Sequence, residues 1–124
     1  MTTQFSLDES LKRAVVTVMP GLQTTTVAET VLRLTKQRPA LGGWDWIFDI
    51  RAPHEKATAD ELDQIARAFN AAWSKQSYTI FVSDDPATYD RCAVMALKFL
   101  DRRHLVAKTM AEAKALLPWT MPSI

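Results

Sequence analysis

Residues 44–62, WDWIFDIRAPHEKATADEL, run from an apolar segment through a charged loop into the start of a helix. The aromatic side chains alternate with two acids and an isoleucine, and this period of two predicts a half-buried strand over residues 44–50. Thr58 and Glu61 have the spacing of a capping box, which predicts a helix that begins after Thr58. A strand, a loop and a helix in this order are typical of α/β proteins.

The remaining segments continue this alternation on both sides of the quoted stretch. In chain order, the patterns predict a hairpin within residues 5–19, a helix from 26 to 38, the strand and helix above, a strand at 78–82, a helix from 86 to 100, a strand at 104–108 and a helix at 110–117. Strands separated by amphipathic helices imply right-handed crossovers and a mainly parallel sheet. We therefore expect one α/β domain over residues 1–124, with the order ββαβαβαβα, an N-terminal antiparallel hairpin and a C-terminal tail at 118–124.

Two helices are expected to bury a broad apolar stripe. In the helix after Thr58 the stripe comprises Leu62, Ile65, Ala66, Phe69, Ala72 and Trp73. In the next helix it comprises Cys92, Ala93, Ala96, Phe99 and Leu100. Cys92 is the single cysteine, so we predict a buried structural thiol and no internal disulfide.

Charge and hydropathy exclude several classes of partner. The chain has 15 basic and 14 acidic residues with a net charge of +1. It therefore lacks the broad positive electrostatic field that favours binding of nucleic acid. Arg102, Arg103 and His104 form a short basic cluster, which we interpret as a solvated turn. No apolar run is long enough for a membrane span, and the polar N-terminal segment predicts a cytoplasmic protein without a signal peptide. His54 and His104 lie far apart in sequence, so we expect no metal and no cofactor.

Three stretches resemble the SpoIIAA-like family of small stand-alone bacterial STAS domains. They are FSLDESLKRAVVTVMPG (5–21), YTIFVSDDP (78–86) and HLVAKTMAEAKALLP (104–118). The resemblance implies a STAS-like fold and a non-enzymatic regulatory role through protein contact, as in anti-sigma-factor antagonists. Those antagonists carry a phosphorylatable Ser or Thr where this chain has Thr58. A Ser-Gly pair is missing around Thr58, so the hydroxyl is either a weak phosphorylation candidate or a helix cap.

This resemblance leads us to expect a partner surface near the start of the helix after Thr58. The partner would be another protein or a second copy of the chain. The candidate residues are His54, Glu55, Lys56, Thr58, Ser83, Asp84 and Asp85.

Two other functions remain open. STAS domains are similar in topology to CRAL-TRIO lipid carriers, which implies a carrier of a small apolar or lipid-like ligand, with Trp44, Trp46 or Phe69 lining a pocket. An enzyme using His54 with Asp49 or Asp84 is the third alternative. The sequence has no Gly-x-Ser-x-Gly turn or other catalytic motif, so we expect no enzymatic activity.

Overall fold

The computed structural model describes residues 3–20 and 25–117, so the expected tail at 118–124 lies outside the described residues. The elements are β1 (Thr3–Asp8), β2 (Arg13–Val18), α1 (Val27–Gln37), the 3-10 helix η1 (Pro39–Gly43), β3 (Asp45–Asp49), α2 (Ala59–Ala71), β4 (Ser77–Val82), α3 (Ala87–Ala96), β5 (Arg102–Ala107) and α4 (Met110–Leu116). The predicted order of strands and α-helices is confirmed, and η1 is an addition that the sequence patterns did not predict.

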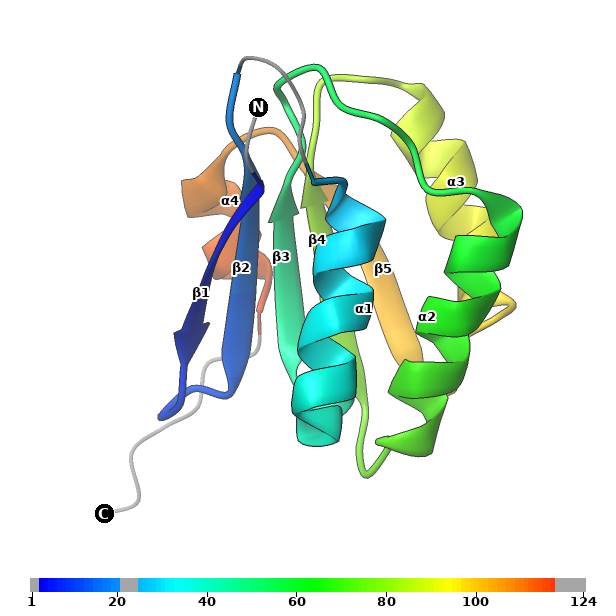
Figure 1. The fold of residues 1–124 in the computed structure, drawn as a ribbon. Coiled ribbons are helices and arrows are strands. Elements are labelled where there is room, and N and C mark those ends of the chain that lie inside the picture. Colours follow the sequence, from blue (N-terminus) through cyan, green and yellow to red (C-terminus); the bar gives the residue numbers. More distant parts are fainter. Residues whose placement is uncertain (1–2, 21–24, 118–124) are drawn as a thin grey trace.

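Within the described residues, the strands form one five-stranded sheet in the sequential order β1-β2-β3-β4-β5 (Figure 1). β1 runs antiparallel to β2, and the other neighbouring pairs are parallel, as predicted. Crossovers of one hand between sequential strands place their helices on the same face of the sheet. Accordingly, residues of α1, α2 and α3 share one core, and α4 packs behind the sheet on the opposite face (Figure 1).

The central strand β3 is buried on both faces, so the prediction of a half-buried strand was wrong. Trp46 and Phe48 face the core beneath α1 and α2. Ile47 faces the other way and packs in the cluster with Ala113 and Leu117. The second face is covered because the short α4 folds back over β4 and β5, an arrangement that alternation within β3 cannot reveal.

Both predicted apolar stripes need correction at their C-terminal ends. α2 ends at Ala71, so Trp73 lies beyond the helix and is 48% exposed. α3 ends at Ala96, and Ala93, Ala96 and Leu100 are exposed. The buried side chains of this segment are Thr88, Cys92, Met95 and Phe99, which follow the helical spacing of three and four residues. The prediction of a buried Cys92 is confirmed.

Arg102 is buried in β5, so the solvated-turn interpretation of the basic cluster was wrong. Its guanidinium donates hydrogen bonds to the carbonyls of Gly42, Trp44 and Tyr78 and to the hydroxyl of Thr79. Its Cζ lies 4.7 Å from the centroid of the Phe69 ring. Arg102 therefore fastens η1 and the start of β3 to strands β4 and β5.

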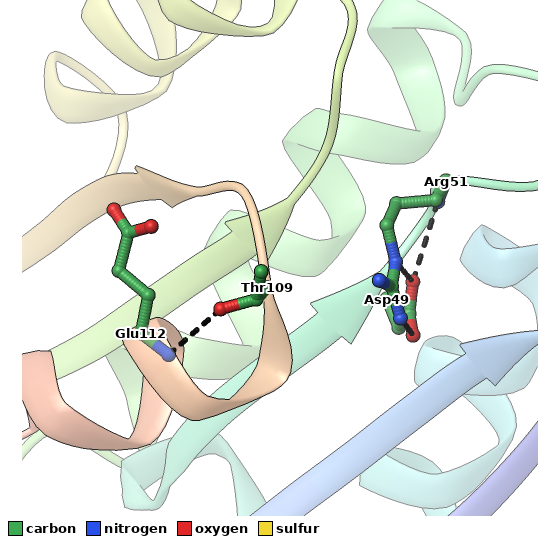
Figure 2. A network of polar contacts seen from close by, with 4 residues as sticks. All are labelled: Asp49, Arg51, Thr109 and Glu112. Atoms are coloured by element: carbon green, nitrogen blue, oxygen red, sulfur yellow. Dashed lines mark hydrogen bonds and ion pairs between the residues drawn. The ribbon is translucent and has the colours of Figure 1, made fainter.

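The predicted capping box at Thr58 is confirmed, and threonines also cap two other helices. Thr26 and Thr58 each make a complete capping box. Thr109 accepts a hydrogen bond from the Glu112 amide at 3.1 Å (Figure 2). The Glu112 carboxylate, however, accepts from the amide of Lys108 at 3.3 Å. Each cap satisfies backbone donors that the first turn of a helix leaves unpaired.

Candidate ligand-binding pocket

A cavity of about 110 Å³ lies between the sheet and the helices on the α1–α3 face. We call it the α1–α3 cavity. It is lined by Val27, Ala28, Val31, Phe48, Ile50, His54, Glu55, Lys56, Ala57, Leu62, Ile65, Phe69, Thr79, Phe81, Arg91, Met95, Phe99 and His104. The lining is mostly aliphatic and aromatic, with a few polar groups, which is the usual make-up of a small-molecule site.

Side chains alternate between the two faces of a strand, and this alternation directs the lining residues of the sheet toward the cavity. Phe48 on β3 and Phe81 on β4 are register partners, and their rings stack with centroids 5.4 Å apart. Phe69 of α2 meets Phe99 edge to face at 5.6 Å. Because such aromatic pairs pack in defined orientations, the cavity has firm walls on the sheet side and on the helix side.

His104 is the ionisable side chain that the sheet contributes to the cavity lining, beside the hydroxyl of Thr79. Its ring lies 4.8 Å from the centroid of Phe99, and its Nδ1 is buried without a hydrogen-bond partner among the described residues. Burial, and then the positive charge of Arg102, lower the pKa of His104 from 6.5 to about 4. The imidazole is therefore neutral at pH 7.

Two cations line the cavity from the loop before α2 and from α3. Lys56 Nζ lies 3.8 Å from a carboxylate oxygen of Asp85, and both side chains are about half exposed. Arg91 of α3 is half-buried. It makes no hydrogen bond or ion pair with any residue in the part of the chain that the structure describes.

Of the three predicted ligand residues, Phe69 lines the cavity and the two tryptophans do not. Trp46 is fully buried, and its Nε1 donates to the Leu41 carbonyl at 2.8 Å. Trp44 is 6% exposed, with the Arg38 guanidinium 4.9 Å from the ring centroid. Both lie at the amino end of β3 beside η1, whereas the cavity includes the carboxyl end of that strand. Their core role was the simpler interpretation of the sequence.

The two segments of the predicted partner surface lie together, because the Lys56–Asp85 ion pair joins the loop before α2 to the turn after β4. Asp84 is exposed there, and Glu55 is exposed and lines the cavity. Ser83 differs from expectation, since it is only 5% exposed and its hydroxyl lies 2.9 Å from that of Thr88. A short polar side chain at the end of a strand was equally compatible with a buried turn.

Thr58 and Asp85 both act at the start of a helix. The Thr58 hydroxyl accepts from the Glu61 amide at 3.1 Å, and the Glu61 carboxylate accepts from the Thr58 amide at 2.9 Å. Asp85 accepts from the Ala87 amide at 3.0 Å. Thr58 therefore has a complete structural role.

The residues of the acid–base alternative, His54 with Asp49 or Asp84, do not come together in the part of the chain that the structure describes. Arg51 holds Asp49 through two side-chain hydrogen bonds of 2.9 and 2.7 Å (Figure 2). These bonds lower the pKa of Asp49 despite its burial. Asp49 alternates with Phe48 and points to the α4 face, whereas His54 lines the α1–α3 cavity and its Nδ1 lies 3.0 Å from the Ala52 carbonyl. Neither Asp49 nor Asp84 contacts His54 by a hydrogen bond or ion pair among the described residues.

Sequence reasoning missed Arg91, Met95 and His104 as residues of the site. Arg91 and Met95 are four residues apart on α3, so helical spacing alone could have placed them together. His104 shares one face of β5 with Arg102 and Val106, but nothing local shows that this face of the strand meets a cavity.

No known family model, curated protein or solved structure matches this chain. Within the described residues, no group of three or more His, Cys, Asp and Glu side chains could hold a metal ion. Among the helices of those residues, none has both the length and the apolar character needed to cross a lipid bilayer.

Proposed function

We propose that this protein binds a small apolar ligand in the α1–α3 cavity and acts as a carrier or sensor of it, without chemistry of its own. The observation that supports this proposal is the aromatic-walled cavity of about 110 Å³. An engineered apolar cavity of about 150 Å³ in another protein takes up benzene. The present cavity therefore suits a short alkyl chain or a small ring.

The position of the cavity is consistent with a binding site. Ligands of open α/β sheets bind toward the carboxyl ends of the strands. The end of β3 and the loop at residues 54–57 both line the cavity. This loop adds polar groups to an otherwise apolar lining, so a ligand can bury its apolar part and keep a polar end near them.

Isothermal titration calorimetry with hexan-1-ol tests the proposal. We compare wild type with Ala57→Phe, which adds a ring at a residue that lines the cavity. The control is Ala59→Phe, which adds the same ring at an exposed position two residues away that does not line the cavity. We expect wild type and the control to bind alike and Ala57→Phe to lose binding. Equal binding by all three proteins would contradict the proposal.

We also propose, as a second candidate, the protein contact that the STAS resemblance implies, in a cytoplasmic protein. The ion pair between Lys56 and Asp85 supports it, because it joins two predicted contact segments into one charged surface beside the start of α2. Sedimentation of wild type and Lys56→Glu over a range of concentrations tests the homodimer form. Self-association that the variant loses supports it, and monomers in both proteins at every concentration contradict it.

A further inference from the structure

The charged residues that line the α1–α3 cavity differ in whether they already have partners. Lys56 contacts Asp85, and Glu55 also has an interaction of its own. Arg91 is half-buried yet has neither a hydrogen bond nor an ion pair with the residues that the structure describes. The side chain of Arg91 therefore lines the cavity with guanidinium donors that no described residue engages.

Arg91 lies on the same face of α3 as the apolar residues of that segment that line the cavity. Met95 follows it by one helical turn on the same face, and Phe99 continues that line beyond the end of the helix. A ligand lying along this row could contact Met95 and Phe99 with its apolar body while its polar end meets Arg91.

We infer that the α1–α3 cavity takes a small apolar monocarboxylate, whose carboxylate pairs with Arg91. This inference rests on the proposed function and adds the class of ligand. A guanidinium offers two parallel N–H donors that match the two oxygens of a carboxylate. His104 belongs to the same lining, and its buried Nδ1 has no hydrogen-bond partner among the described residues.

The experiment compares hexanoate with hexan-1-ol by isothermal titration calorimetry at pH 7. The two ligands have the same chain length and differ in the charged end. The proteins are wild type, Arg91→Gln and Arg33→Gln. Arg33 lies exposed on α1 and does not line the cavity, so its variant changes net charge equally without touching the site.

We expect wild type and Arg33→Gln to bind hexanoate at least about tenfold more tightly than hexan-1-ol, as a charge-assisted pair provides. In Arg91→Gln this preference should disappear, because the affinity for hexanoate falls far more than the affinity for hexan-1-ol. Equal affinities for the two ligands in wild type, or a preference retained in Arg91→Gln, would overturn the carboxylate assignment and leave the apolar pocket standing. Failure of both ligands to bind wild type would overturn the proposed function as well.

Discussion

The imidazole ring of His104 packs against the phenyl ring of Phe99, with 4.8 Å between the ring centroids, on the wall of the α1–α3 cavity. β5 supplies the imidazole, and the segment between α3 and β5 supplies the phenyl ring. The contact therefore couples the sheet to the α3 side of the cavity. It also keeps an ionisable ring in a largely apolar environment, which has a measurable consequence for stability.

The stability of the fold should fall as pH decreases through the range set by His104. Its pKa is about 4 in the folded protein and 6.5 ordinarily, so between these values the unfolded chain binds the additional proton. The free energy of unfolding should decrease from pH 6.5 to pH 4 by up to about 1.4 kcal/mol per pH unit. Urea unfolding at several pH values measures this slope. His104→Gln should flatten it and His54→Gln should retain it, and identical slopes in all three proteins would refute the assignment.

Replacing Arg102 should strongly destabilise the fold. Arg102→Met removes the donor for the buried carbonyls of Gly42, Trp44 and Tyr78, so we expect a loss of about 2–4 kcal/mol. The matched control is Arg103→Met, one residue along on the exposed side of β5, with an expected effect within about 0.5 kcal/mol. Urea unfolding measures both values. Similar small losses in the two variants would show that Arg102 does not hold η1 to the sheet.

The Thr58 hydroxyl should contribute to stability as a helix cap. Thr58→Ala removes the acceptor for the Glu61 amide and should cost about 1 kcal/mol, as should Thr26→Ala at the start of α1. Thr58→Ser keeps the hydroxyl and should lose much less. Thermal or urea unfolding decides the matter, and an unchanged stability in Thr58→Ala would leave its hydroxyl without the structural role described above.

Much of the fold could be predicted from local pattern. The period of two in residues 44–50 and the capping box at Thr58 are properties of short segments, and both elements appear where they were expected. The predictions of burial failed where contacts between segments far apart in the sequence determine whether a side chain is buried. Arg102 is buried because acceptors 58 and 60 residues away reach it, and no window around it contains them.

The candidate site was less predictable than the fold. Phe69 was expected to line an apolar pocket because it lies on a helix stripe, and it does so. Trp44 and Trp46 were expected there because they begin a strand where a ligand could reach them, but they are buried at the other end of β3. No sequence pattern pointed to Arg91, because its significance comes from the absence of a hydrogen bond or ion pair with the described residues.

Intermolecular nuclear Overhauser effects can show whether a small apolar ligand enters the α1–α3 cavity. With hexan-1-ol bound, we expect cross-peaks from the alkyl chain to the Met95 methyl group and to the ring protons of Phe69 and Phe99. The outer surface offers a built-in comparison, because Trp73, Leu97 and Leu100 are 48%, 89% and 56% exposed. Cross-peaks confined to those three side chains, or none at all, would mean that the ligand does not enter the cavity.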